Sequence, residues 1–511
     1  MSMLHLLLSG CLFVAFAAAG ETVKPELKPA KLTPAARIEG KMLTIDVPSG
    51  HEGLENYAEF TLDLGQYASC HLIGTIRSKF TGFRPDQDRR KGIDLRLSYR
   101  ADDDSHDRLG GGFFRNESLK NGTLQFGFTL DPYARQCKMR ISLNNCSGKA
   151  EFDLASLEFT PLFTPPKEEY VCEYSDAVKA RPVHRGVMSP IRNQTDEEDF
   201  RELRRWNVNL MRLQLNTSEQ WARSEPAKYR AFIRDKIDNV IPKALDLGQK
   251  YGIKIIIDLH TAPGSNRMTD NPDFNGLYDN DDAVKEYLAI WEEIAEKFHR
   301  HPALYGYDLM NEPKQHRPAK YNYRDLQYEA AKRIRAIDPE TPIYVESNMM
   351  CSPLSFYYLE PLKLRNIIYQ VHFYEPFDYT HHFIRKAADR KAGRVKVNTF
   401  PGDYYGTHWS GDLVQIRKKL TYVRAFEQRF KAKIYVGEFS APAYAPGAEQ
   451  YLASCIKVFE EYGWDWTYHA FRESKGWDVE YAGTADDDLV RVPTTPRREV
   501  LLNAFKKNRK E

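Results

Sequence analysis

The stretch ALYGYDLMNEP (residues 303–313) decides the fold, because a run of apolar residues ends abruptly in two adjacent polar side chains. Asn311 and Glu312 follow the apolar run directly, and Pro313 then stops it. Burying an amide or a carboxylate without a partner is costly, so polar groups at the end of a buried segment indicate that something there uses them. The pattern favours a strand whose carboxyl end carries functional side chains.

Seven more apolar runs of this kind follow one another along the chain. They are VHRGVM from 183, VNLMRLQL from 208, IKIIIDL from 253, PIYVES from 342, NIIYQVHF from 366, AKIYVGEF from 432 and WDWTYHAF from 464. Amphipathic segments separate them, such as 281–298, where the apolar residues recur on one helical face. A doubly wound sheet usually has fewer strands and a glycine-rich phosphate turn. Residues 166–511 are therefore predicted to form the α/β architecture of a (β/α)8 TIM barrel.

The chain before the barrel has a different pattern. Residues 37–165 contain short runs that alternate at period two, for example Ile93, Leu95 and Leu97, and these predict an all-β sandwich domain. The proline-rich TPLFTPPKEEY (160–170) ends this pattern and marks the domain boundary. The sandwich is similar to a carbohydrate-binding module only in its architecture and in its position before a predicted catalytic domain. A purely structural domain is the alternative. Residues 21–36, rich in proline and lysine, are predicted to be a disordered leader.

Residues 1–20, MSMLHLLLSGCLFVAFAAAG, form an apolar stretch that ends in small residues. They predict a signal peptide and therefore a secreted or periplasmic protein. The apolar run continues after Cys11, which argues against lipid anchoring at that residue. No later stretch has the length of apolar sequence that an integral membrane segment needs. The six remaining cysteines form no CxxC pair, and a bridge between Cys137 and Cys146 or buried free thiols are both left open.

Charge and motifs narrow the class of partner. The chain has 73 Lys and Arg against 71 Asp and Glu, a formal net charge of +2, which argues against a nucleic-acid or anionic membrane partner. No GxGxxG or GxxxxGK[ST] motif follows a predicted strand, so no nucleotide is implied. We expect a monomer that requires no cofactor and no metal and that acts on a neutral ligand.

The polar residues that end the apolar runs should converge on one barrel mouth. They are Arg212, His260, Asn311, Glu312, Glu346, His372, Tyr374 and Glu438, with a further cluster after the eighth run. Glu312 and Glu438 end the fourth and seventh runs, which face each other across a barrel. Glycoside hydrolysis needs such a pair of carboxyl groups, one protonated and one charged.

Five motifs, LMNEP (309–313), NLMRLQL (209–215), IDLH (257–260), VHFY (371–374) and YVGEF (435–439), resemble those of glycoside hydrolase family 5, the cellulase family of clan A, in order and in strand position. The resemblance covers about residues 183–505. It implies that Glu312 is the general acid/base, Glu438 the nucleophile and Asn311 a ligand of the sugar 2-hydroxyl. It also implies that Arg212 and Tyr374 orient and charge the nucleophile, and that His260 and His372 line the sugar site.

The eighth run departs from the family pattern. Many relatives place a tryptophan under the sugar there, whereas the alignment of GWDWTYHAFRE (463–473) puts His469 near that position. The stacking ring could come from Trp466, Phe471 or Trp477 instead. Two further carboxylates, Glu346 and Glu473, are rivals of the named pair. The loop 375–410 is long enough to form a lid or cleft wall, and its Tyr379, Tyr404, Tyr405 and Trp409 either stack on sugars or pack the loop onto the barrel.

The sequence as a whole predicts a retaining glycoside hydrolase that cleaves a β-linked polysaccharide or oligosaccharide, foremost a β-glucan, by double displacement. The stretch DLHTAPGSN (258–266) resembles exo-β-1,3-glucanases of the family, so exo-β-1,3-glucanase and mannanase activities are alternatives. A non-catalytic carbohydrate-binding barrel is an alternative of another class, and so is a metal-dependent amidohydrolase. The latter usually needs an HxH pair on the first strand, where VHRGV offers only His184.

Overall fold

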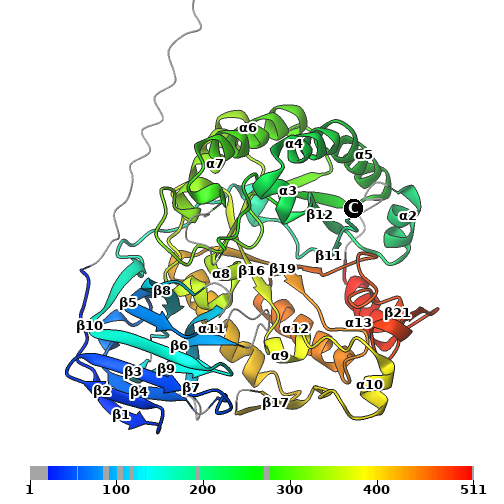
Figure 1. Ribbon diagram of the computed structural model, residues 1–511. Helices are drawn as coiled ribbons and strands as arrows, with labels where there is room; N and C mark the ends of the chain where they lie inside the picture. The colour runs from blue at the N-terminus through cyan, green and yellow to red at the C-terminus, as the bar shows by residue number, and fades with distance from the viewer. Residues whose placement is uncertain are drawn as a thin grey trace, which may run out of the picture.

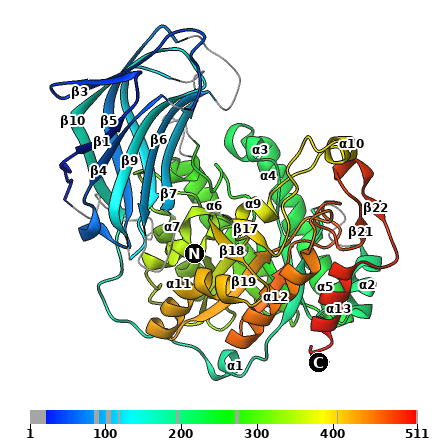
Figure 2. The ribbon, with the colours of Figure 1, turned by 90° about the horizontal axis from the view of Figure 1, so that it is seen from below.

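The computed structural model describes residues 21–54, 56–83, 91–100, 107–115, 119–132, 134–191, 196–269, 276–404 and 406–508. The predicted signal peptide (1–20) lies outside the described residues, as does Tyr405. The described part divides into an N-terminal β-sandwich and a β/α barrel, which lie side by side (Figures 1 and 2). None of its helices is long and apolar enough to cross a membrane.

The sandwich consists of two five-stranded antiparallel sheets. One has the order β1 (Lys28–Leu32), β4 (Tyr57–Leu62), β9 (Arg135–Asn144), β6 (Gly92–Arg100) and β7 (Asp107–Arg115); the other has β2 (Ala36–Glu39), β3 (Met42–Val47), β10 (Gly148–Phe163), β5 (His71–Thr81) and β8 (Gly122–Thr129). Alternate residues of the strands point inward, so that Ile93, Leu95 and Leu97 of β6 are fully buried between the sheets. Cys137 and Cys146 are both buried in the core of the sandwich, and the Cys137 thiol is free.

The segment 21–36, predicted as a disordered leader, is instead part of the sandwich. Strand β1 pairs with β4, and Val23 forms a bridge with Phe159 of β10. The backbone groups of this segment complete the edges of both sheets, and Thr33 fixes the connection because its Oγ1 lies 3.0 Å from both the carbonyl oxygen and the amide nitrogen of Tyr57. Proline and lysine suit an edge strand, where a missing N–H or a charge faces water.

The barrel is closed by eight parallel strands in chain order, as the sequence predicted. They are β11 (Arg185–Met188), β12 (Leu210–Gln214), β13 (Lys254–Asp258), β14 (Leu304–Asp308), β15 (Ile343–Glu346), β16 (Ile367–Phe373), β19 (Lys433–Phe439) and β20 (Asp465–Tyr468). Each lies within one of the eight predicted apolar runs. Most of their residues are buried, because the barrel interior covers one face and the helices cover the other.

Helices cover the outside of the barrel. The longest are α2 (Glu197–Arg205), α4 (Pro226–Asp235), α5 (Ile241–Tyr251), α6 (Asp281–Phe298), α7 (Tyr323–Ile337), α11 (Val414–Phe430), α12 (Ala448–Tyr462) and α13 (Pro496–Phe505). In α6 the predicted apolar face, which includes Tyr287 and Trp291, is buried against the barrel, and the Asn280 side chain caps the helix by accepting from the N–H groups of Asp282 and Ala283.

The loops at the carboxyl ends of the strands carry short elements of their own. These are α3 (Glu219–Ser224), α8 (Asn348–Cys351), α9 (Phe377–Thr380), α10 (Ala387–Lys391), the hairpin β17 (Gly402–Tyr404) and β18 (Thr407–Trp409), and the hairpin β21 (Tyr481–Ala482) and β22 (Val490–Arg491). Helix α1 (Asp176–Lys179) precedes the first barrel strand.

The sandwich packs directly on the barrel. The Tyr422 hydroxyl of α11 donates a hydrogen bond of 2.9 Å to Asp131, which follows β8. The ring of His71 on β5 packs beside Tyr358, with centroids 5.8 Å apart. A Cβ placed on Gly127 of β8 would lie 2.9 Å from the His316 carbonyl oxygen, so the two backbones approach very closely here. His316 belongs to the loop after β14, the loop that also carries Glu312.

Candidate active site

Arg212 of β12 forms the floor of the candidate site. Its side chain is fully buried and lies close to four carboxylates: Asp258 at 3.2 Å, Asp308 at 2.7 Å, Glu346 at 2.9 Å and Glu438 at 2.8 Å. Each comes from the end of a different barrel strand. A single guanidinium cannot neutralise four charges, so burial favours the protonated form of some of these carboxyl groups.

The pKa shifts separate these carboxyl groups. Burial, reinforced by the neighbouring Asp258, raises the pKa of Asp308 to about 6, although Arg212 opposes the shift. Burial also raises the pKa of Glu346 well above its usual range, and Asp308 adds to this effect. Both of these groups lie at the bottom of the site, where they are fully buried.

Glu438, at the end of β19, is in the opposite state. Burial works to raise its pKa, but the charges of His372 and His469 outweigh burial and, together with Arg212, hold the pKa well below its usual range. Its Oε1 accepts a hydrogen bond of 2.8 Å from Arg212, and its Oε2 accepts one of 2.9 Å from the Tyr374 hydroxyl. Glu438 is therefore a buried carboxylate that is kept ionised by its neighbours.

Glu312 follows β14 and has a positive φ of 46°, which turns its side chain out of the direction of the strand. Its backbone N–H donates a 2.6 Å hydrogen bond to Glu346 Oε2, so the buried carboxyl group fixes this turn. Its Oε1 lies 3.0 Å from Nδ1 of His372, and its Oε2 forms an ion pair with Arg267. Burial raises the pKa of Glu312, but the hydrogen bond with His372 and the charge of Arg267 outweigh burial, so the pKa is lowered.

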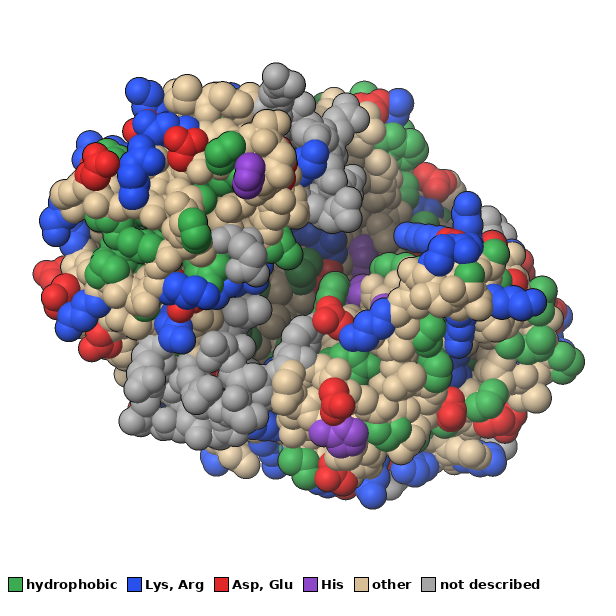
Figure 3. All heavy atoms as spheres, turned by 60° about the horizontal axis from the view of Figure 1, so that its bottom comes forward, with side chains coloured by type: hydrophobic (Ala, Val, Ile, Leu, Met, Phe, Trp, Pro, Cys, Tyr) green, Lys and Arg blue, Asp and Glu red, His purple; other side chains and the backbone are tan. Residues whose placement is uncertain are grey.

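The two glutamates meet around His372. A carboxylate oxygen of Glu312, a ring nitrogen of His372 and a carboxylate oxygen of Glu438 all lie within 4.8 Å of one another. The side chain of Glu312 is 15% exposed and that of Glu438 is 5% exposed, so both can be reached only from the barrel mouth. The molecular surface is deeply hollowed beside the sandwich, and histidine side chains show inside this hollow (Figure 3).

Asn311 and His260 complete a chain of hydrogen bonds next to the pair. Nε2 of His260 lies 3.1 Å from Nδ2 of Asn311, and Nδ1 of His260 lies 2.8 Å from Asp258. Oδ1 of Asn311 accepts a hydrogen bond of 3.0 Å from Arg212, which fixes the orientation of the amide. All the polar residues predicted from the strand ends are thus brought together at one mouth.

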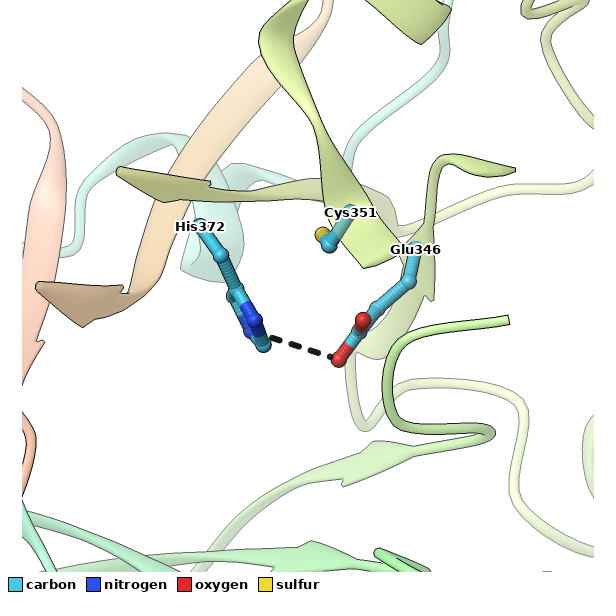
Figure 4. Close-up of side chains that lie close together, drawn as sticks. All are labelled: Glu346, Cys351 and His372. Carbon is cyan, nitrogen blue, oxygen red and sulfur yellow. Dashed lines mark ion pairs between the residues drawn. The ribbon is translucent and has the colours of Figure 1, made fainter. Parts of the chain in front are cut away.

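Two groups of side chains have the types and spacing that metal ions use: Glu346, Cys351 and His372 (Figure 4), and the triad of Glu312, His372 and Glu438. Their atoms already serve one another. Oε1 of Glu346 accepts from Arg212, and Sγ of Cys351 lies 3.0 Å from the Gln370 carbonyl oxygen. A cation at Glu346 would have to compete with the buried guanidinium of Arg212, and one at the triad with the contacts of Glu312 to Arg267 and of Glu438 to Arg212, so we assign both groups to the hydrogen-bond network of the site.

The three candidate stacking rings have different positions. Trp466 is fully buried against Phe505, and Phe471 is buried against Trp206. Trp477 alone of the three packs against a residue that contacts Glu438, with its ring centroid 6.1 Å from that of Tyr374. It is also 5.7 Å from the ring of His469, which the sequence placed where relatives have a tryptophan.

The described aromatic residues that were predicted either to stack on sugars or to pack the loop 375–410 onto the barrel do the latter. Tyr379, Tyr404 and Trp409 are buried and hold the loop to the barrel. Among the described residues of this loop, the exposed phenylalanine rings are Phe377 and Phe383, which are 51% and 48% exposed and were missed from the sequence. Both rings lie against the His381 ring, which in turn packs on Tyr374. The feature of the sequence that could have identified Phe377 and Phe383 was their position soon after the end of β16.

The rival carboxylates occupy supporting positions. Glu346 lies beneath the pair, where it is fully buried, and Glu473 accepts a 2.7 Å hydrogen bond from Gln214 and lies 3.3 Å from His469. Burial would lower the pKa of His469, but Glu473 and Glu438 raise it to about 9. The sequence interpretation also missed Arg267, which lies seven residues after the predicted His260 in the same loop.

A closed β/α barrel with a close pair of glutamates at its mouth defines a class of enzyme, the barrel glycoside hydrolases. The family model described as "Cellulase (glycosyl hydrolase family 5)" matches residues 175–475, more than half of the chain. The chain therefore belongs to glycosyl hydrolase family 5, as the motifs predicted, and is a glycoside hydrolase.

Individual relatives are distant. Endoglucanase C of Acetivibrio thermocellus is 27% identical over 239 residues, which cover 43% of this chain and 67% of that protein. The probable glucan 1,3-β-glucosidase A of Aspergillus fumigatus is 24% identical over 187 residues, 36% of this chain and 43% of that protein. Among solved structures, endoglucanase Cel5A of Thermotoga maritima superimposes with a TM-score of 0.45 at 20% identity, covering 62% of this chain and 96% of that one.

Proposed function

We propose that this protein is a retaining glycoside hydrolase that cleaves a β-glucan, with Glu438 as nucleophile and Glu312 as general acid/base. The observation that carries the proposal is the approach of these two carboxylates, whose oxygens lie within 4.8 Å of each other. Retaining glycosidases hold their carboxyl groups about 5 to 5.5 Å apart, whereas inverting enzymes need about 6.5 to 9.5 Å to admit a water molecule.

In the first step, Glu438 attacks the anomeric carbon while Glu312 gives its proton to the departing glycosidic oxygen. This breaks the bond to the leaving sugar and forms a glycosyl ester on Glu438. In the second step, Glu312 takes a proton from water as the water oxygen bonds to the anomeric carbon, and Glu438 leaves as a carboxylate. The low pKa of Glu438 and its hydrogen bonds from Arg212 and Tyr374 favour its role as nucleophile and leaving group.

The neighbouring residues have supporting roles in this proposal. Asn311, held by Arg212, offers its Nδ2 beside the pair, where it can donate to a sugar hydroxyl next to the anomeric carbon. His372 lies between the two glutamates, 3.0 Å from Glu312 and 3.7 Å from Glu438, and keeps their separation fixed. Trp477 supplies an apolar ring face for a pyranose.

Substitution of the two glutamates tests the mechanism. Glu438→Gln should lower turnover of a β-glucan by several orders of magnitude while the circular dichroism spectrum stays unchanged. Glu312→Ala should lose activity on the glucan but keep much of its kcat/KM on 2,4-dinitrophenyl β-cellobioside, whose leaving group needs no proton, while its kcat on this substrate should fall because the second step lacks its base. Near-normal glucan turnover in Glu438→Gln would refute the assignment of the nucleophile.

The linkage is tested separately. An endo-acting β-1,4-glucanase is the first candidate, and the endoglucanases among the relatives support it. A second candidate is an exo-acting β-1,3-glucanase, which the stretch DLHTAPGSN after β13 and the glucan 1,3-β-glucosidase relatives favour. Product analysis on barley mixed-linkage glucan, laminarin, carboxymethylcellulose and mannan separates these activities by linkage and by the length of the released sugar.

Two further expectations belong to this proposal. The apolar residues 1–20 favour export from the cytoplasm, which would bring the enzyme to its polysaccharide. The sandwich, packed beside the hollowed surface, is placed where it could contact a long glucan chain.

A further inference from the structure

Arg267 is a charged residue of the active site to which the proposed mechanism gives no role. It lies in the loop between β13 and α6, and its Nη2 forms an ion pair with Oε2 of Glu312. The Arg267 side chain is 35% exposed, while its Nε is buried and, among the described residues, makes no hydrogen bond. The guanidinium is therefore directed at the acid/base and is otherwise little constrained.

Both oxygens of the Glu312 carboxylate are engaged in this arrangement. Oε1 faces Nδ1 of His372 at 3.0 Å, and Oε2 faces Arg267. A general acid must carry a proton on one of these oxygens. A proton on Oε2 would replace a charge-assisted hydrogen bond to a guanidinium, which is one of the stronger hydrogen bonds in proteins. The two states of Glu312 thus differ directly in their contact with Arg267.

The other charged and titratable groups around Glu312 come from every neighbouring strand end. They are Glu346 of β15, Cys351 of the following loop, His372 of β16, Tyr374 and His381 after it, Glu438 of β19 and His469 after β20. Arg267 is the one permanent cation within this set that contacts the Glu312 carboxylate, since Arg212 binds the other carboxyl groups.

We propose that Arg267 is a positioning residue of the acid/base, an inference that rests on the proposed function of Glu312. It holds Glu312 as a carboxylate in the free enzyme and so favours proton uptake from water in the second step. For the first step, Glu312 must take up a proton and loosen its contact with Arg267; when that proton passes to the leaving oxygen, the ion pair forms again. Arg267 therefore sets the pH range in which the enzyme can work.

The variant Arg267→Gln tests this proposal because it removes the charge but keeps the loop. The loop is held through the backbone of Arg267, whose carbonyl oxygen accepts from Arg223 at 3.1 Å and whose N–H donates to Ser265 at 3.2 Å. Side-chain substitution leaves these bonds in place. A thermal unfolding curve recorded beside the kinetics shows whether the variant is folded.

The readout is the pH dependence with two substrates. With cellotetraose, kcat/KM requires protonated Glu312, so the alkaline limb should move up by about one pH unit in Arg267→Gln, because an opposite charge at contact distance lowers a carboxyl pKa by about one to three units. With 2,4-dinitrophenyl β-cellobioside, the second step limits kcat and requires ionised Glu312. The acid limb of kcat should therefore move up in the same direction.

Two further variants complete the experiment. Arg267→Lys keeps a cation and should shift both limbs in the same direction by a smaller amount. This variant also tests the proposal if Arg267→Gln does not fold. Lys314→Gln removes a neighbouring cation that has no ion pair with Glu312 among the described residues, and its limbs should stay close to those of the wild type. The proposal would be overturned if both Arg267 variants lost activity while the limbs of their pH profiles stayed at the wild-type positions.

The failure of this inference is distinguishable from failure of the proposed function. If Glu312→Ala and Glu438→Gln behave as expected while the Arg267 variants keep the wild-type limbs, only the role of Arg267 is refuted. If Glu312→Ala hydrolyses cellotetraose as fast as the wild type, the assignment of the acid/base is refuted first.

Discussion

The hydroxyl group of Tyr374 donates a hydrogen bond of 2.9 Å to Oε2 of Glu438, the oxygen that Arg212 leaves free. Burial and the charge of Glu438 raise the pKa of Tyr374 well above its usual range, so the phenol stays protonated as a donor. The same hydroxyl lies 2.7 Å from Nδ1 of His469. Glu438, the proposed nucleophile, is therefore oriented from two sides by groups that keep their protons.

Tyr374→Phe removes one of the two hydrogen bonds that Glu438 accepts from Tyr374 and Arg212, together with the contact between the hydroxyl and His469. A hydrogen bond to a charged group contributes about 1.5 to 3 kcal/mol, so we expect kcat to fall by about 10- to 100-fold. Steady-state kinetics on a β-glucan oligosaccharide provides the measurement. Tyr307→Phe, which removes a buried hydroxyl that donates a 2.8 Å hydrogen bond to Asp338 after α7, is the matched control and should keep wild-type turnover.

His469→Gln should move the acid limb of kcat/KM to higher pH. The reaction requires ionised Glu438, whose pKa is held low partly by the charge of His469, and His469 itself has a pKa raised to about 9. Removing that cation raises the pKa of Glu438, so activity is lost at a higher pH on acidification. A pH profile checks the shift, with His408→Gln in the exposed β17–β18 hairpin as control. Coinciding acid limbs would contradict this electrostatic role.

Asp308→Asn should reduce the loss of folding stability that the protein shows as the pH rises. In the folded protein the pKa of Asp308 is about 6, above its usual value of about 3.9. The protonated carboxyl group therefore stabilises the fold fully below about pH 3.9, and this stabilisation is lost as the pH rises through about 6. The loss amounts to about 3 kcal/mol at most by linkage.

The asparagine fits this position. Oδ2 of Asp308 accepts from Arg212 at 2.7 Å and Gln370 at 3.1 Å, which an amide oxygen can also do, while Oδ1 has no hydrogen-bond partner among the described residues. Urea unfolding at about pH 5 and about pH 8 should show a smaller decline for Asp308→Asn than for the wild type. The exposed Asp246→Asn should retain the wild-type decline.

Trp477→Ala should weaken substrate binding without unfolding the protein. The ring lies beside Tyr374 and His469 at the mouth, and we expect kcat/KM on a soluble β-glucan to fall by about tenfold, since stacking adds about 0.5 to 1.5 kcal/mol beyond the buried area. Trp221→Ala on α3, outside this ring cluster, is the comparison. Equal losses of kcat/KM in both variants would argue against a sugar platform at Trp477.

The fold was predictable because the barrel strands differ from everything around them. Each is a short, continuous apolar run, and the first polar residues after it lie at the barrel mouth. The strands ending near Arg212, His260, Glu312, His372 and Glu438 could thus be recognised one by one. Strand order in a parallel barrel follows chain order, so the convergence of these residues needed no further information.

The remaining features depend on contacts that the sequence pattern does not encode. Asp258 and Asp308 sit inside apolar runs, and only the closed barrel shows that they share one arginine. Arg267 meets Glu312 because the loop after β13 pairs with the loop after β14 through a parallel bridge between Arg267 and Lys314. The order of residues 21–36 arises from edge pairing with β4, to which local composition gives no clue. In the loop 375–410, ring type could not separate buried Tyr379 from exposed Phe377.

The close approach of Gly127 to His316 places the sandwich against the loop that carries Glu312, the proposed acid/base. A barrel cut free at the proline-rich boundary would lose this packing together with the Asp131–Tyr422 contact, and its two glutamates would be held less firmly in register. Protein engineers who wish to exchange the N-terminal domain should therefore keep the surface around β8 that contacts the barrel.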